Sequence, residues 1–211
     1  MIIDLAKQIR SASEDEFTNV ELITSTGNFV VPAGITRLFV ETVGGGGGAG
    51  DTADNLEFAG GGGGGAARGY ISVTPGETIS ATIGAGGAAT PNNYTTAPEA
   101  GGTTSFGTYI SATGGGAAST SNGGQGGTGS LDDVISGYVR TGQGGQQMAF
   151  TSAGTFIQGA LGGNSPFVNG CQSIKWDSIA FLNGAANTGA GGSAGANGSG
   201  NGATGYIEIK W

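Results

Sequence analysis

Carboxylate pairs and one glycine motif are the patterns in this 211-residue chain that could support chemistry. Asp132 and Asp133 are adjacent, and Asp51 is close to Asp54, so either pair could serve acid–base catalysis or bind calcium. Acids this close in sequence are more often solvated loop charges. The chain has no histidine, which excludes Ser-His-Asp and Cys-His catalysis and histidine metal sites. We therefore expect no enzyme activity, no metal site and no cofactor.

The glycine motif matches a dinucleotide-binding fingerprint by spacing alone. Gly45, Gly47 and Gly50 satisfy G-x-G-x-x-G directly after an apolar run. The fingerprint requires a helix next, whose N-terminus meets the pyrophosphate. Residues 51–55 are followed almost at once by a run of glycines, which prevents a helix, so the motif does not indicate a nucleotide site.

Aromatic and amide side chains stand in segments between the glycine tracts. Because aromatic faces flanked by amides suit sugar rings and protein loops, we predict that these residues form a binding surface. They are Asn55, Phe58, Asn92, Asn93, Tyr94, Met148, Phe150 and Phe156. The alternative is that the aromatic residues cap the ends of the glycine tracts. We assign Phe167, Trp176 and Phe181 to the core instead.

The glycine tracts themselves favour a folded chain over a disordered one. Glycine contributes 48 residues and proline 5, a proportion that borders on low complexity. However, 36% of residues are hydrophobic and only 10% are charged, whereas disordered chains are typically charged and poor in apolar residues. Gly189, Gly192, Gly195 and Gly198 keep the three-residue period of a polyproline-II helix. We therefore expect a bundle of such helices, packed closely because glycine has no side chain.

Apolar residues alternate at period two between the tracts, which predicts strands. The expected elements are strands at 20–24, 28–31, 36–43 and 206–211, a hairpin over 67–83 around Pro75 and Gly76, and a second hairpin over 103–113 around Gly107. The final strand must pair with strands far back in the sequence.

If each tract runs away from the sheet or back to it, the chain alternates between two ends. Tracts 44–50, 84–88, 114–116 and 142–145 lead out, and tracts 60–66, 101–102, 123–129 and 159–163 lead back. Residues 130–141 and 164–183 then belong to the sheet end, and a last excursion leaves near Gly184 and returns through 198–202. This alternation predicts a sheet at one end and loops at the other.

Residues 1–18 contain no glycine and form a segment separate from the glycine-rich domain at 19–211. Ile2, Leu5 and Ile9 recur at helical spacing, which predicts a short amphipathic helix. A helix this short is marginal alone in water, so it packs on its own domain or docks on another protein.

The charge balance excludes some partners. The net charge is −8 and the seven Lys and Arg residues are scattered, which argues against nucleic acid and anionic membranes. No secretory signal or membrane span is present in the sequence, so we expect synthesis in a cytoplasm without export. The single cysteine, Cys171, is most simply a small buried residue.

An ordered succession of motifs lies at 31–36, 44–48, 65–77, 82–87, 102–107, 111–116 and 202–211. This succession resembles the glycine-rich domain of bacteriophage tail-fibre proteins, and the resemblance covers roughly residues 20–211. It implies a jelly-roll-like β-sandwich that carries an inserted polyglycine-II helix bundle. It also implies a place at the tip of a viral appendage, where loops between glycine motifs contact a receptor.

The resemblance implies partners and a location. The receptor would be a bacterial surface polysaccharide or outer-membrane protein, other virion proteins would hold residues 1–18, and the chain would be exposed on the virion. Viral fibres are commonly homotrimers, although no heptad stretch here dictates one. A capsid- or tail-attached structural protein without receptor binding is the alternative. Ice binding is a third class, which the irregular loops disfavour.

Overall fold

The structure is a computed structural model that describes residues 17–51, 58–90, 96–119, 122–147, 149–150, 156–167, 182–195 and 198–211. Strands are the regular elements in these ranges, and no helix occurs among them, which confirms the expectation of a mainly β fold. The helix predicted within residues 1–18 and the site of Cys171 lie outside the described residues.

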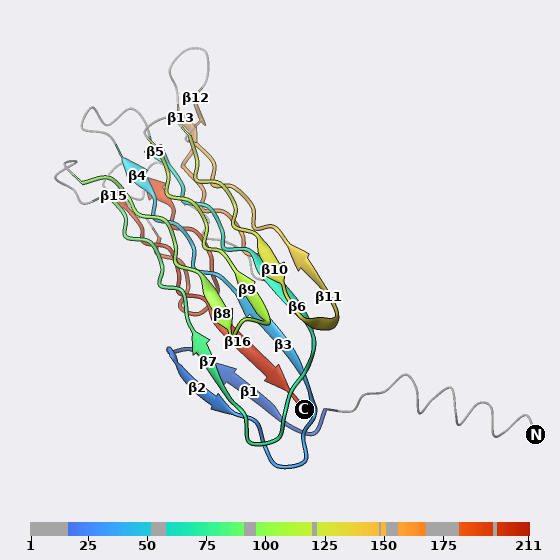
Figure 1. Cartoon of the computed structure of the whole chain (residues 1–211). Coiled ribbons are helices and arrows are strands. Elements are labelled where there is room, and N and C mark those ends of the chain that lie inside the picture. The colour runs from blue at the N-terminus through green and yellow to red at the C-terminus, as the bar shows by residue number, and fades with distance from the viewer. Residues whose placement is uncertain are drawn as a thin grey trace, which may run out of the picture.

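Ten of the strands form two antiparallel sheets at one end of the molecule (Figure 1). In sheet A the order is β1 (Val20–Ile23), β16 (Tyr206–Lys210), β3 (Arg37–Val43), β6 (Ala66–Ser72) and β11 (Val134–Arg140). In sheet B the order is β10 (Gly129–Leu131), β9 (Ile110–Ala112), β8 (Thr104–Phe106), β7 (Thr78–Thr82) and β2 (Gly27–Val30).

The last strand, β16, closes sheet A from within, as the sequence predicts. Ile207 lies opposite Thr42 of β3 on one side and Ile23 of β1 on the other. Ile207 and Ile209 are fully buried, and the residues that alternate with them face the other side of the sheet. The chain terminus is therefore held between two strands that are more than 160 residues earlier.

The hairpin predicted over 103–113 is confirmed, and the one predicted over 67–83 is wrong. β8 and β9 pair around Gly107, whose φ of 54° is one that glycine adopts readily. In contrast, β6 pairs with β3 and β11 in sheet A, and β7 pairs with β2 and β8 in sheet B. The turn at Pro75 and Gly76 carries the chain from one sheet to the other, where the Gly76 N–H donates to the Val31 carbonyl at 2.9 Å.

One apolar cluster takes residues from both sheets. Leu38, Val40, Ile71, Ile207 and Ile209 come from sheet A and are fully buried. From sheet B come Phe29, Ile79, Ala81, Phe106 and Ile110, each at most 3% exposed. The alternation of apolar and polar residues thus places the inner face of each sheet against the same core.

The glycine tracts are joined by backbone hydrogen bonds that repeat every three residues. In tract 44–49, successive N–H groups donate to three different tracts, 60–65, 99–102 and 200–203, at 2.8–3.1 Å. Gly44 and Gly47 donate to the first, Gly45 and Gly48 to the second, and Gly46 and Ala49 to the third. Successive residues of this tract therefore bond to three different neighbouring tracts in turn, and the same tract recurs at every third residue.

Tract 44–49 lies in the middle of this arrangement and is fully enclosed. Its carbonyl groups accept from three further tracts: Gly45 from Gly115, Gly46 from Gly87 and Gly47 from Gly192. Tract 60–65 is surrounded in the same way, and both are buried throughout. On outer tracts only every third residue is buried, as at Gly84, Gly87 and Thr90, so side chains such as Ala85 and Ala88 are accommodated.

The tracts alternate in direction as predicted, with one exception. Tracts 44–49, 84–90, 113–118 and 141–146 lead away from the sheets, and 60–65, 99–103, 123–128 and 160–165 lead back (Figure 1). The prediction that 182–183 belongs to the sheet end is wrong, because Leu182 and Ser193 share hydrogen bonds.

Residues 182–188 instead lead toward the sheets beside the returning tract 200–205. The Gly184 N–H donates to the Asn201 carbonyl and the Asn187 N–H to the Thr204 hydroxyl. The last outward tract then starts at Gly189. The chain reverses next to Asn187, whose φ is 56°, a conformation that asparagine tolerates. No run of glycines lies at this reversal, so the spacing of the glycines does not predict it.

Candidate functional site

The end of the tracts that lies away from the sheets, which we call the distal end, is held by three short strand pairs (Figure 1). They are β4 (Gly50–Asp51) with β5 (Phe58–Ala59), β12 (Ala149–Phe150) with β13 (Phe156–Gln158), and β14 (Ala194–Gly195) with β15 (Gly198–Ser199). Segments 52–57, 151–155 and 196–197 each join the two strands of one pair. The backbone positions at which these segments begin and end are therefore determined by the tracts.

The segment 91–95 also starts from a well-defined position. Thr90 is 5% exposed, its N–H donates to the Ala49 carbonyl, and its own carbonyl accepts the Ser199 hydroxyl at 2.7 Å. One residue earlier, the Ala89 N–H donates to Asn201 Oδ1 at 2.8 Å. These bonds link the outgoing tract 84–90 to the last returning tract at the distal end.

Phe58 is a packing residue in the structure. Its side chain is 3% exposed and clusters with Ala49, Ala160 and Ala194, which come from three different tracts. The prediction of Phe58 as a receptor contact is therefore wrong, and the alternative that aromatics cap the glycine tracts holds for this residue. A large apolar side chain fits here because the alanines leave room between the tract ends.

The other predicted contacts are placed only in part. The structure brings the backbones of Phe150 and Phe156 together, as register partners between β12 and β13. Asn55, Asn92, Asn93, Tyr94 and Met148 lie outside the described residues, as do the predicted docking residues Ile2, Leu5 and Ile9.

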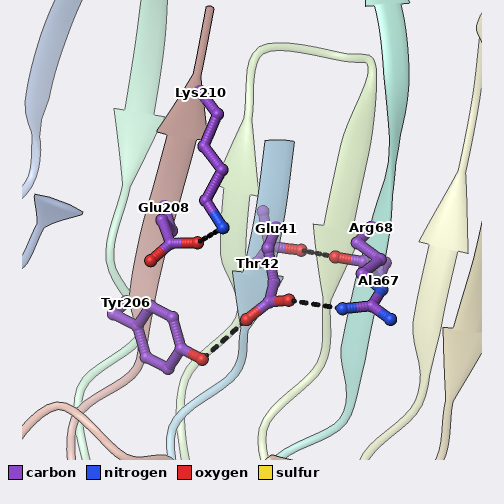
Figure 2. A network of polar contacts seen from close by, with 7 residues as sticks. All are labelled: Glu41, Thr42, Ala67, Arg68, Tyr206, Glu208 and Lys210. Carbon is purple, nitrogen blue, oxygen red and sulfur yellow. Dashed lines mark hydrogen bonds and ion pairs between the residues drawn. The ribbon is translucent and has the colours of Figure 1, made fainter. Parts of the chain in front are cut away.

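A polar network crosses the outer face of sheet A, the face opposite the core (Figure 2). Tyr206 donates its hydroxyl to Glu41 Oε1 at 2.8 Å, and Arg68 Nη1 lies 3.4 Å from Glu41 Oε2. The network therefore joins β16, β3 and β6 through one carboxylate whose side chain is only 11% exposed. Next to it, Lys210 and Glu208 form an ion pair at 2.6 Å, in which both side chains are 30% exposed.

The surroundings of Tyr206 determine the protonation state of its hydroxyl group. Burial raises the pKa of the Tyr206 hydroxyl far above its ordinary value of 10, and the negative charge of Glu41 raises it further. Tyr206 therefore stays protonated and serves as a hydrogen-bond donor. The network connects the closing strand β16 to Glu41 of β3, which is 165 positions earlier, so its role is structural.

Tyr206→Phe is expected to lower the free energy of unfolding by about 1–3 kcal/mol at pH 7, because it removes a donor from the nearly buried Glu41. The pH dependence should change as well. In the wild type, the unfolded chain loses the Tyr206 proton above pH 10 while the folded chain keeps it, so stability falls as pH rises. Tyr206 contributes up to about 1.4 kcal/mol per pH unit to this decline in the free energy of unfolding, and screening by solvent reduces its contribution.

Urea unfolding between pH 7 and pH 11 measures both effects. The Tyr206→Phe variant should lose stability at pH 7 and show a shallower decline above pH 10, although Tyr109, whose pKa is also raised by burial and by Glu77, keeps part of the slope. Tyr138→Phe is the control, since that side chain is 38% exposed, and it should change stability by less than about 0.5 kcal/mol at pH 7. Equal effects of the two substitutions would contradict the role of the network.

The described residues contain no group of three or more His, Cys, Asp or Glu side chains that could hold a metal ion. In the same part of the chain, no helix is long and apolar enough to cross a membrane.

No curated protein matches this sequence. The family model of a glycine-rich domain matches residues 23–211, which is nearly the whole length and includes every tract and all strands except most of β1. The chain therefore belongs to the glycine-rich domain family.

Proposed function

We propose that this protein is a bacteriophage virion appendage protein, a tail-fibre or tail-tip adhesin, that recognises a host-cell receptor through the distal end. The observation that carries the proposal is the two-ended architecture. The sheets form one end, and closely packed glycine tracts separate them from the segments at the other end (Figure 1). The resemblance of the motifs to the glycine-rich domain of phage tail fibres supports the viral assignment.

The scaffold is, in this proposal, a β-sandwich that carries a polyglycine-II helix bundle. The core shared by the two sheets supports the sandwich. The three-residue repeat of hydrogen bonds supports the helix bundle, because a polyglycine-II strand makes all of its hydrogen bonds to neighbours. A bundle of this kind is rigid, since every N–H group of the central tracts 44–49 and 60–65 is bonded to a neighbouring tract, and it holds its end segments at determined positions.

In this proposal the distal segments make the receptor contacts, because the glycine tracts carry few large side chains that could contact a receptor. The proposed contacts are Asn55, Asn92, Asn93, Tyr94, Met148, Phe150 and Phe156. Phe58 is not among them, because its side chain is buried. Amides and aromatic rings suit the hydroxyls and apolar faces of a surface polysaccharide, or the loops of an outer-membrane protein.

Attachment to the particle would use the opposite end. Phe17 packs on the outer face of sheet A, with its ring centroid 5.7 Å from that of Phe39 and 6.2 Å from that of Tyr70. The preceding residues 1–16 therefore join the domain at the sheets. In this proposal they form a helix that docks on other virion proteins through Ile2, Leu5 and Ile9, and the distal end points away from the particle.

Purified, dye-labelled protein is expected to bind cells of a permissive bacterial host, and an excess of unlabelled protein should reduce adsorption of the virus. Fluorescence microscopy and an adsorption assay measure the two effects, with a resistant strain as the control. If the folded protein binds no permissive host and does not compete with the virus, the structural virion role without receptor binding is the better account.

A further inference from the structure

A pocket of about 490 Å³ opens where the edge strand β11 meets the sheet ends of tracts 141–146 and 160–165. Arg140, at the end of β11, lines it together with Gln143, Asn164 and Phe167. These four side chains come from two stretches, 140–143 and 164–167, that are close only in the folded chain. The volume is in the range of small-molecule sites. This site is separate from the distal end, at the other end of the tracts.

Arg140 is a cation without an ionic partner among the described residues. Its guanidinium carbon lies 5.4 Å from the ring centroid of Tyr138 and 5.9 Å from that of Phe167. Arg68 lies over the same two rings, at 4.4 and 5.4 Å, but Glu41 neutralises it. A guanidinium held against aromatic rings keeps its N–H groups available, and their planar geometry matches a carboxylate or phosphate. Such a cation attracts an anion locally, although the net charge of the chain is −8.

The lining of the pocket also supplies amide groups. Asn164 Nδ2 donates to Gln143 Oε1 at 2.7 Å, which orients the Gln143 amide so that its Nε2 donors lie away from this bond. Gln143 is exposed, in keeping with an outer position of its tract. Ser165 holds the following segment in place, since its buried hydroxyl donates to the Thr188 carbonyl at 2.5 Å. The segment that carries Phe167 is therefore anchored at the edge of the pocket.

We propose that this pocket binds a sugar residue that carries a carboxylate, as in an acidic polysaccharide. Arg140 would pair with the carboxylate, Gln143 and Asn164 would bond the ring hydroxyls, and the ring of Phe167 would pack on the apolar face of the sugar. This pocket is a second surface with its own ligand, and its role is independent of whether the distal end binds a receptor.

Titration of ¹⁵N-labelled protein with sodium glucuronate tests the site. The side-chain amide signals of Gln143 and Asn164 should shift with saturation in the millimolar range, as expected for one sugar residue with few contacts. Glucose, which lacks the carboxylate, should give at least about tenfold weaker binding. Inorganic phosphate distinguishes a bare anion site from a sugar site, and it should also bind at least about tenfold more weakly than glucuronate.

Two variants and a control assign the effect to Arg140. Arg140→Gln should abolish the shifts, and Arg140→Lys should weaken binding by about tenfold, because an ammonium cannot pair in the bidentate manner. Arg37→Gln is the matched control, since Arg37 is a cation on the same sheet whose guanidinium lies over Tyr70 at 5.0 Å, and it should leave binding unchanged. The proposal is overturned if glucuronate shifts neither amide, if glucose or phosphate binds as tightly as glucuronate, or if Arg140→Gln and Arg37→Gln have equal effects.

Discussion

Gly47→Ala is expected to prevent the protein from folding, or to destabilise it by at least about 4 kcal/mol, although it adds only one methyl group. A Cβ atom at Gly47 would lie 2.0 Å from the carbonyl oxygen of Gly116 and 2.6 Å from its carbonyl carbon. Both are backbone atoms of a neighbouring tract and cannot rotate away. Moving that tract would break hydrogen bonds to its own neighbours, because the Gly116 N–H donates to the Gln125 carbonyl and the Gly116 carbonyl accepts from the Gly62 N–H.

Gly27→Ala is the matched control for this substitution. Gly27 lies in β2, and a Cβ atom there would meet nothing within 4 Å. Alanine also restricts the unfolded chain more than glycine does, so stability should be unchanged or rise by up to about 1 kcal/mol. Circular dichroism and urea unfolding of both variants measure the difference. If Gly47→Ala melts within a few degrees of the wild type, the tracts are not packed as the structure has them.

Phe106→Ala is expected to cost about 3–5 kcal/mol, the second largest effect, because it removes a fully buried ring from the core between the two sheets. Phe106 lies in β8 of sheet B, and its ring centroid is 5.8 Å from that of Phe29 in β2. Phe29 in turn meets Trp211, which follows β16 of sheet A, at 5.7 Å. The cavity would therefore open at a point where both sheets meet.

Ile135→Ala serves as the control for the core substitution. Ile135 lies in β11 and is 56% exposed, so its truncation should cost less than about 0.5 kcal/mol. Unfolding in urea gives both values. Similar losses for Phe106→Ala and Ile135→Ala would mean that the two sheets do not share a core.

The local pattern of the sequence predicts most strands but not all of their partners. Alternating apolar residues mark strands because one face of each sheet is buried, and this holds for β3, β6, β7 and β16. The same alternation does not say whether a turn joins two strands of one sheet or of two sheets. The connection at Pro75 and Gly76 is of the second kind, and no local signal distinguishes it from a hairpin.

The glycine spacing predicts the tracts for a clear physical reason. A position that faces three close backbones tolerates only glycine, so the central tracts 44–48 and 60–65 appear as uninterrupted runs. Outer tracts have one exposed face and therefore show glycine mixed with alanine, threonine and glutamine. The direction of residues 182–188 could not be predicted, because their reversal at Asn187 and Gly189, which both have positive φ, is not marked by a run of glycines.

The sites were harder to predict than the scaffold. Phe58 is an aromatic residue of the kind that often binds ligands. It is buried, however, against three alanines that are near it only in the folded chain. The Tyr206–Glu41–Arg68 network escaped prediction because its members are distant in sequence, although their position on the polar face of alternating strands was a usable signal. Phe167 is predicted to lie in the core, but in the structure its side chain is partly exposed and lines a pocket beside Arg140.

The most direct test of the proposed function is the binding of the labelled protein to permissive host cells before and after substitution of the distal segment 91–95. The variant Asn92→Ala/Asn93→Ala/Tyr94→Ala should bind at least about tenfold more weakly while it keeps the wild-type melting temperature. Val30→Ala, at a 59% exposed position of the sheet end, should bind as the wild type does. Unchanged cell binding by the folded triple variant, with binding lost in a variant at the sheet end, would contradict recognition through the distal end.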